Sequence, residues 1–250
     1  MKYGICPLSI VPLRAEAGDP SEMVTQVLYG DLMQVLETQK KWSHVQLQFD
    51  GYEGWIDNKQ FQFITKEEYE ALSTATPILT SDLVDFIATD EAQLLAIPIG
   101  SSLNGLQILQ HEYEGNSISG TLQKFQLIQT ALLYLNAPYL WGGKTPFGID
   151  CSGFTQMVYK LNGCQLLRDA SEQATQGDAL SFIEESEAGD LAFFDNEEGA
   201  IIHVGIIMED HCIIHAHGKV RIDRLDQTGI FNTELGRHTH KLRVIKRIIR

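Results

Sequence analysis

The sequence predicts an α+β domain that follows a small β-barrel module, and three observations support this fold class. Short β-rich segments joined by turns fill residues 1–64. Apolar residues then recur at helical spacing from Leu122 to Leu135, and Pro138 closes that element. Strand-like segments return from Asp190 onward. Helices followed by an antiparallel sheet are typical of an α+β domain.

The first module is expected to span residues 1–64. Its β-rich segments alternate with turn-forming residues such as Gly30-Asp31 and Asp50-Gly51. The expected strands are 24–28, 32–37, 42–49 and 54–56. Several short strands at this density favour a small β-barrel.

Residues 65–118 are expected to form a linker helix and a possible second, degenerate β module. Thr65 precedes a short helical pattern and Glu68 follows three residues later, which is the signature of a capping box. Segments 94–97 and 106–109, together with a Gly-Asn turn near residue 115, indicate the second module.

The third region, residues 119–250, carries the α+β pattern. After the helix that Pro138 closes, a loop rich in glycine and proline precedes a second amphipathic helix at 151–161. Its apolar positions include Phe154, Met157 and Leu161. The strands expected after it are 190–194, 201–208, 212–217 and 242–249.

Composition excludes several function classes. The formal net charge is −14, so the acidic chain repels phosphate backbones and nucleic acid is not an expected partner. From Arg237 onward there are six Lys or Arg and no acidic residue, which fits either a membrane or nucleic-acid patch or a strand whose charges offset an acidic body. The approximate alternation of this segment favours the strand.

Targeting signals are also missing from the pattern. No segment approaches the ~20 apolar residues of a membrane span, and Pro7 and Pro12 interrupt the N-terminal stretch. We therefore expect a cytoplasmic protein with no membrane partner. In that compartment the four cysteines, Cys6, Cys151, Cys164 and Cys212, are expected to be free thiols.

A reactive cysteine is predicted at Cys151. A glycine-rich loop ends at Asp150, which is well placed to cap a helix that begins at or near Cys151. The first turn of a helix offers free backbone N–H groups, which favour a thiolate and can stabilise an oxyanion. Gly142, Gly143 and Gly153 would let backbone and substrate approach closely.

A β-hairpin over residues 201–217 is predicted to supply the base. In the register that places Gly205 opposite His215, His203 shares a face with His215 and lies directly opposite His217. His203 is the candidate base, and both His215 and His217 are candidates to hold its second ring nitrogen. Gly205 leaves room beside the ring.

The same histidines allow a second interpretation as a zinc site. His203, His215 and His217 form a set of three ligands that would leave one coordination position open. Cys151 would then have no role, so the thiol mechanism is favoured. The other histidines are expected to be ordinary core or surface side chains: His44, His111, His211, His238 and His240.

Four strings in this chain resemble the NlpC family, papain-like cysteine peptidases that act on bacterial murein peptides. YLWGGKTPFGIDCSGFTQ, from Tyr139, resembles the nucleophile motif. GDLAFF from Gly189, HVGI from His203 and IHAHGKV from Ile214 resemble the other blocks in order and spacing. The resemblance covers about half of the chain and implies a papain-like fold, with helices packed on an antiparallel sheet.

The resemblance implies a role for each matching residue. Cys151 matches the nucleophile, His203 the base and His215 the polar residue that orients the base. Tyr139 matches a tyrosine whose hydroxyl lies beside the nucleophile and assists the oxyanion. The resemblance implies neither a metal nor a cofactor.

A narrower resemblance concerns the γ-D-glutamyl-L-diamino acid endopeptidases of this family, which carry bacterial SH3-like domains in front of the peptidase. The string RDASEQ from Arg168 resembles a block of these enzymes, and 24–31 with 51–55 resemble their first SH3-like domain. Asp31 and Tyr52 match the residues that bind the free amine of the substrate's L-Ala. The further substrate-binding candidates are Trp141, Asp150, Ser152, Arg168 and Ser171.

The resemblance therefore implies hydrolysis of the γ-D-Glu to diamino acid bond in murein peptides with a free N-terminal L-Ala. Without a signal peptide, the expected setting is cell-wall recycling. Two alternatives remain at this point: a zinc-dependent hydrolase built on the three histidines, and a non-catalytic protein that binds the wall through its SH3-like modules.

Overall fold

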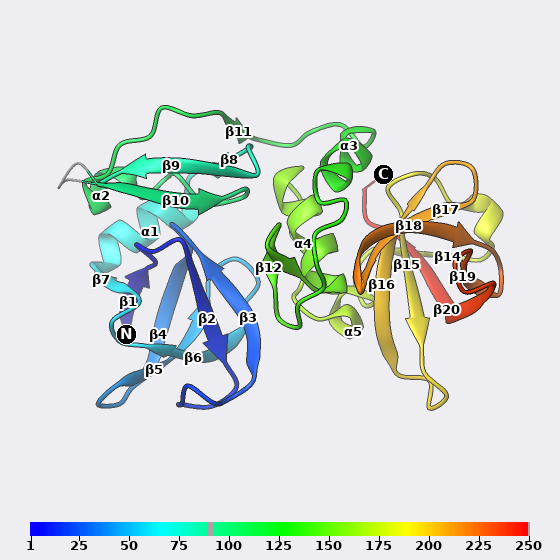
Figure 1. Cartoon of the computed structure of the whole chain (residues 1–250). Coiled ribbons are helices and arrows are strands. Elements are labelled where there is room, and N and C mark those ends of the chain that lie inside the picture. The colour runs from blue at the N-terminus through cyan, green and yellow to red at the C-terminus, as the bar shows by residue number, and fades with distance from the viewer. Residues whose placement is uncertain (90–92, 250) are drawn as a thin grey trace. The chain divides into compact units, whose positions relative to one another are not determined.

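The computed structural model describes residues 1–89 and 93–249, and the chain forms two compact units. The N-terminal unit is Met1–Thr121 and the C-terminal unit is Leu122–Arg250 (Figure 1). Across the described part of the chain, no helix combines the length and the apolar character that crossing a bilayer requires.

A seven-stranded antiparallel sheet forms most of the N-terminal unit. Its order is β3-β2-β6-β5-β4-β1-β7. All four strands predicted between residues 24 and 56 are present, whereas β1, β2 and β7 were not predicted, since they are short and prolines lie in or beside two of them. The bounds are β1 Lys2–Ile5, β2 Ile10–Arg14, β3 Met23–Leu28, β4 Leu32–Thr38, β5 Trp42–Leu47, β6 Glu53–Asp57 and β7 Gln62–Ile64.

The linker helix α1, Lys66–Thr74, begins as the capping box predicts. The Glu68 backbone N–H donates to the Thr65 hydroxyl at 3.2 Å, and the Glu68 carboxylate accepts from the Thr65 N–H at 2.7 Å. Tyr69 of α1 stacks on Tyr3 of β1 with ring centroids 4.3 Å apart, which holds the helix on the sheet.

Residues 76–118 add small pieces of structure to the same unit. The predicted strand at 94–97 is present, but the β segment expected at 106–109 is wrong, since it forms one helical turn. A four-residue apolar run does not distinguish strand from helix. The elements are β8 Ile78–Thr80, β9 Val84–Ala88, β10 Leu94–Pro98, α2 Leu106–Leu109 and β11 Ser117–Ser119.

This segment shares a hydrophobic core with the first sheet. Ile87, Ile97 and Leu103 pack in one buried cluster with Ile5 and Tyr29. The close approach continues at the backbone, because a Cβ on Gly30 would lie 2.0 Å from the Ser102 carbonyl oxygen. Residues 76–118 therefore contribute to the same core as the first sheet.

The C-terminal unit contains a second seven-stranded antiparallel sheet of order β14-β20-β15-β16-β17-β18-β19, in which β19 also pairs with β20. That extra pairing closes six of the strands into a ring (Figure 1). The strands are β14 Asp178–Leu180, β15 Leu191–Asp195, β16 Ile201–Met208, β17 Cys212–His217, β18 Lys219–Leu225, β19 Gly229–Asn232 and β20 Arg237–Arg247.

Helices and a short hairpin precede and accompany this sheet. They are α3 Gln126–Leu133, the hairpin β12 Lys144–Thr145 with β13 Gly148–Ile149, α4 Cys151–Leu161, α5 Ala170–Gln173 and the 3₁₀ turn η1 Ile183–Glu185. Helix α4 has the predicted bounds, but α3 begins four residues later than expected. The unit has more strand and less helix than an α+β description implies, which therefore holds only loosely.

Helix α4 is buried along its whole length, and the packing around it fixes the position of its first residue. The predicted apolar positions Phe154, Met157, Val158 and Leu161 all lie in the core. Tyr134, which caps α3, packs edge-on against Phe154 with ring centroids 6.0 Å apart. A helix surrounded by packed side chains cannot easily tilt or slide, so its first residue is rigidly positioned.

The C-terminal basic segment forms a strand, β20, as its alternation predicted. Arg247 of this strand donates to the buried carboxylate of Asp190 at 2.9 Å. Lys124, which lies just before α3, contacts the same carboxylate at 2.9 Å. These contacts hold the pKa of Asp190 below its usual value even though burial opposes this.

Candidate active site

The carboxylate of Asp150 joins the glycine-rich loop to the start of α4. One oxygen accepts the Gly153 backbone N–H at 2.6 Å, which makes Asp150 the predicted N-cap. The other oxygen accepts the Gly142 N–H at 2.8 Å. A single side chain therefore fixes both backbone segments next to Cys151.

Arg168 lies behind Asp150 in a bidentate ion pair. Its two terminal nitrogens donate to the two carboxylate oxygens at 3.1 and 2.6 Å, and one of them also donates to the Ser152 hydroxyl at 2.9 Å. The Arg168 side chain is 1% exposed. Removing one partner of a charged pair buried this deeply strongly destabilises the folded protein. The pair therefore holds the loop in shape.

Glycine is required where the loop crosses the helix. A Cβ on Gly153 would lie 2.3 Å from the Gly143 carbonyl oxygen, and Gly142 has a φ of +74°. The sequence prediction that these glycines allow close backbone approach is confirmed.

Cys151 is the first residue of α4 and is buried. Burial, followed by the charge of Asp150, raises the pKa of its thiol to about 12, although backbone N–H groups of Val204 and Ser152 act in the opposite direction. The backbone contacts at the helix start favour the thiolate as expected, but burial and the charge of Asp150 outweigh them in the resting site. The proton must leave during the reaction, and a base must take it.

The β16–β17 hairpin has the predicted register, with Gly205 opposite His215. It brings the Nε2 of His203 to 2.8 Å from the Nδ1 of His215. A Cβ on Gly205 would lie 2.9 Å from the Cβ of His215, so the glycine provides the expected room. His217 is exposed and its ring centroid is 6.4 Å from that of His203, which leaves His215 as the partner.

Both histidines are neutral at rest. Burial lowers the pKa of His203 well below its usual value, and the neighbouring His215 and His240 lower it further. Burial also lowers the pKa of His215, against the opposing effect of Asp223. A neutral imidazole can accept the proton of the Cys151 thiol, and the sulfur already contacts β16 through the Val204 N–H.

Asp223 and Arg221 of β18 extend the chain of contacts and were not predicted. The Asp223 carboxylate lies 3.1 Å from the Nε2 of His215. Arg221 donates to its two oxygens at 2.7 and 3.0 Å. Gly218 is the feature of the sequence that could have revealed both residues. A tight turn at Gly218 places Arg221 opposite His215, and Asp223 two residues further along the same face.

His240 of β20 was expected to be an ordinary side chain, and this is wrong. Its ring stacks on that of His203 with centroids 4.2 Å apart and an interplanar angle of 24°. Burial, then His215 and His217, lower the pKa of His240 to about 4. The site is thus a cluster of four imidazoles.

The zinc interpretation gains no support from this geometry. Within residues 1–89 and 93–249, no group of three or more His, Cys, Asp or Glu side chains is arranged to hold a metal ion. The nitrogens of His203 and His215 point at each other at hydrogen-bond distance, whereas ligands of one ion would point at a common centre.

Tyr139 lies near Cys151. Its pKa is raised to about 12 by burial first and then by Cys151 and Asp150, whose charges reach it. Its backbone N–H donates to the Gly218 carbonyl at 3.0 Å, which fixes the start of the glycine-rich loop. Trp141, two residues further on, is 62% exposed.

Ser152 and Ser171 lie on two connected helices. The Gln173 side chain of α5 donates to the Ser152 carbonyl at 2.9 Å and accepts from the Thr155 hydroxyl at 2.7 Å. Ser171, also on α5, is exposed. Gln173 therefore joins α5, which carries Ser171, to the first turn of α4, which carries Ser152.

Asp31 and Tyr52 belong to the N-terminal unit. One oxygen of Asp31 accepts the Leu28 N–H at 2.9 Å, in the turn that Gly30 makes at a φ of +77°. Tyr52 is half-buried and packs against the core of the first sheet. The first contact orients the carboxylate, and the second anchors the aromatic ring.

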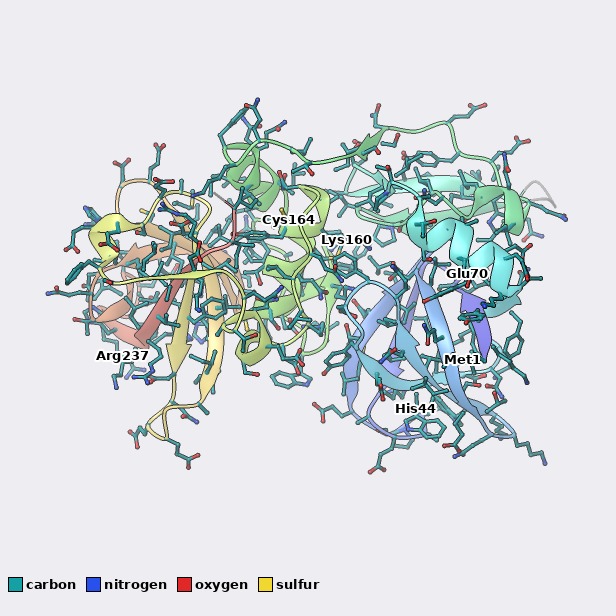
Figure 2. All side chains as sticks on the ribbon, turned by 180° about the vertical axis from the view of Figure 1, so that it is seen from behind. Met1, His44, Glu70, Lys160, Cys164 and Arg237 are labelled. Atoms are coloured by element: carbon teal, nitrogen blue, oxygen red, sulfur yellow. The ribbon has the colours of Figure 1, made fainter. Side chains whose placement is uncertain are left out.

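Two of the remaining cysteines, Cys164 and Cys6, do not lie at the start of α4. Cys164 follows the C-terminal end of α4, just beyond Lys160 (Figure 2), whereas Cys151 begins that helix. Cys6 lies in the core of the N-terminal unit. All four cysteines are free thiols.

Two family models match the chain. Residues 136–238 match the NlpC/P60 family, which covers the nucleophile loop and the histidine strands. Residues 13–61 match the bacterial dipeptidyl-peptidase Sh3 domain.

The chain is also similar to known proteins over most of its length. The chain is 30% identical over 217 residues to a gamma-D-glutamyl-L-lysine dipeptidyl-peptidase of Bacillus subtilis, which covers 77% of this chain and 71% of that protein. It is 28% identical to dipeptidyl-peptidase 6 of Lysinibacillus sphaericus, over 86% and 89% of the two chains. The crystal structure of an NlpC/P60 family protein from Bacillus cereus superposes with a TM-score of 0.78 at 22% identity, over 99% and 100% of the two chains, and shows the same fold.

Fold, site and relatives together define a cysteine peptidase with a bacterial SH3 domain in front of it. The chain belongs to the NlpC/P60 family. Membership in this peptidase family does not support the alternative of a non-catalytic wall-binding protein.

Proposed function

We propose that this peptidase hydrolyses the γ-D-Glu to L-diamino acid bond of murein peptides that begin with a free L-Ala. The observation that supports the peptidase chemistry most strongly is the hydrogen-bonded pair of His203 and His215, on a hairpin whose backbone contacts the Cys151 sulfur. The name of the Bacillus subtilis relative, a gamma-D-glutamyl-L-lysine dipeptidyl-peptidase, supports the choice of bond.

The proposed reaction begins with proton transfer from the Cys151 thiol to His203. The sulfur attacks the γ-carbonyl carbon of D-Glu, and the new oxyanion is stabilised by N–H groups of the first turn of α4 and by the Tyr139 hydroxyl. His203 returns the proton to the amine of the leaving diamino acid. Water, deprotonated by His203, then attacks the thioester, and the dipeptide leaves as Cys151 regains its proton.

Selection of the substrate is proposed to involve both units. Asp31 would pair with the ammonium of the N-terminal L-Ala, and Tyr52 would contact it, so that a blocked amine is rejected. Ser152, Ser171 and Trp141 would contact the γ-D-Glu residue, with Asp150 and Arg168 holding Ser152 in place. Short free peptides of this kind are products of wall turnover, which fits a role in recycling.

Mass spectrometry of products tests the bond and the selectivity together. The tripeptide L-Ala-γ-D-Glu-L-Lys should yield L-Ala-γ-D-Glu and free Lys, while the N-acetylated tripeptide and intact murein should be cleaved far more slowly. An Asp31→Asn variant should raise the KM for the free tripeptide and reduce the difference between free and acetylated forms. Equal rates on both forms by the unaltered protein would remove the proposed role of Asp31 and Tyr52.

A further inference from the structure

We propose that Asp223, supported by Arg221, is a positioning residue that fixes the tautomer of both site histidines and thereby makes Nδ1 of His203 the atom that takes the thiol proton. This inference rests on the proposed roles of Cys151 and His203. It is carried by a continuous series of contacts from Arg221 through Asp223 and His215 to His203.

The carboxylate of Asp223 is ionised. Burial would raise the pKa of Asp223, but hydrogen bonds from His215 and Arg221 outweigh it and keep that pKa below its usual value. An ionised carboxylate has no proton to donate. The Nε2 of His215, 3.1 Å away, must therefore carry the hydrogen of that bond.

The neutrality of His215 determines which of its two ring nitrogens carries the hydrogen. A neutral imidazole carries one N–H, so with the hydrogen on Nε2 its Nδ1 holds a lone pair. The Nε2 of His203 is 2.8 Å from that lone pair and must be the donor. His203 is also neutral, and its own Nδ1 is consequently left with a lone pair, ready to accept a proton.

Arg221 limits how far Asp223 raises the pKa of His215. With two hydrogen bonds to the carboxylate, it takes up part of the negative charge and lowers the pKa of His215. A doubly protonated His215 would donate from Nδ1 as well. The Nε2 of His203 would then have to become an acceptor, and its hydrogen would move to Nδ1, where it blocks the base.

Among the other groups around His215, His217 also lowers its pKa. Charged or titratable side chains face it from every strand of the cluster: His203 from β16, His217 from its own strand β17, Arg221 and Asp223 from β18 and His240 from β20. Glu234 is paired with Arg221 at 3.1 Å. Of these, Asp223 alone favours the charged imidazole, and Arg221 restrains it.

The decisive experiment replaces Asp223 with Asn in the full chain. Asn can donate to the Nε2 of His215, which reverses every donor and acceptor along the series and places a hydrogen on Nδ1 of His203. We expect kcat to fall at least ~10²-fold with KM little changed, because the corresponding change in a serine-type triad acts through the same tautomer fault. The matched control is Asp226→Asn, at an exposed His–Asp pair on the same unit, which should leave kcat unchanged.

Nitrogen-15 NMR of the histidine rings reads the tautomer without any substrate. In a Cys151→Ala background, His203 should show hydrogen on Nε2 and a bare Nδ1, and the added Asp223→Asn change should shift this toward Nδ1–H. Thermal unfolding monitors the fold. A bare Nδ1 in both proteins, or a hydrogen on Nδ1 before Asp223 is changed, would overturn the inference.

An Arg221→Met variant tests the same idea without touching the carboxylate. His215 should then gain a proton at higher pH, so the acid limb of kcat/KM should move up by about one pH unit. An unmoved limb would contradict the role of Arg221. If the proposed tripeptide is not a substrate, alkylation of Cys151, followed by peptide mapping, still reports whether Asp223→Asn disables the base, so failure of the substrate proposal is distinguishable from failure of this one.

Discussion

The site contains two Asp–Arg pairs with buried carboxylates, and they differ in what the carboxylate faces. Asp150 pairs with Arg168 and accepts backbone N–H groups from Gly142 and Gly153. Asp223 pairs with Arg221 and faces an imidazole. A backbone amide cannot take up a proton, whereas a histidine can. The same combination of residue types, Asp with Arg, therefore stabilises the shape of the glycine-rich loop at one place and sets the protonation state of a histidine at the other.

The largest expected effect comes from breaking the first pair. Arg168→Met leaves the Asp150 carboxylate buried without its ion-pair partner, and the free energy of unfolding of the C-terminal unit should fall by ~3–5 kcal/mol. Chemical denaturation followed by circular dichroism measures this. Arg221→Met is the matched variant: His215 can take a proton and neutralise Asp223, so its main consequence should be the shifted acid limb. Equal destabilisation by the two variants would show that the comparison is wrong.

How much of this site could be predicted depends on the range of the interactions. Asp150 caps a helix three residues away, and the hairpin that holds His203 and His215 is defined by its own turn, so sequence pattern sufficed for both. The helix at 106–109 was missed because a short apolar run fits either structure.

Asp223 and His240 were missed for a different reason. Asp223 lies on β18, a strand that was not predicted although it follows β17 through a tight turn. His240 reaches the cluster from β20, which pairs with β15, a strand far from it in sequence. Hydrophobicity is also a poor guide to burial in β18, since Ile222 is 38% exposed and Asp223 only 4%. A buried charge that serves another side chain is recognisable only when its partner is known.

A medium effect concerns pH. Since burial raises the pKa of Cys151 to about 12, its alkylation by iodoacetamide should rise about tenfold per pH unit above about pH 7, without a plateau at lower pH. Since the pKa of His203 is depressed below 6.5, the base stays neutral as the solution becomes acidic, and kcat/KM should hold from about pH 8 to about pH 6. A low-pH plateau in alkylation would instead reveal a preformed thiolate–imidazolium pair.

The smallest expected effect comes from His240. Its ring covers the face of His203, so His240→Ala should loosen the base and lower kcat/KM by roughly 3- to 10-fold, the value of a stacked aromatic pair. His240→Phe keeps a ring in place and should recover most of the loss. Steady-state kinetics on both variants measures the difference, and an unaffected Ala variant would make the stacking incidental.

We propose Cys151 as the nucleophile, with a reactivity that depends on the histidine pair. The most direct measurement compares Cys151→Ala with Cys164→Ala, a change at the other end of the same helix, using the free tripeptide and the unfolding transition of each variant. We predict that Cys151→Ala shows no detectable hydrolysis at an unchanged unfolding midpoint, while Cys164→Ala keeps full turnover. Hydrolysis by folded Cys151→Ala protein would contradict the account.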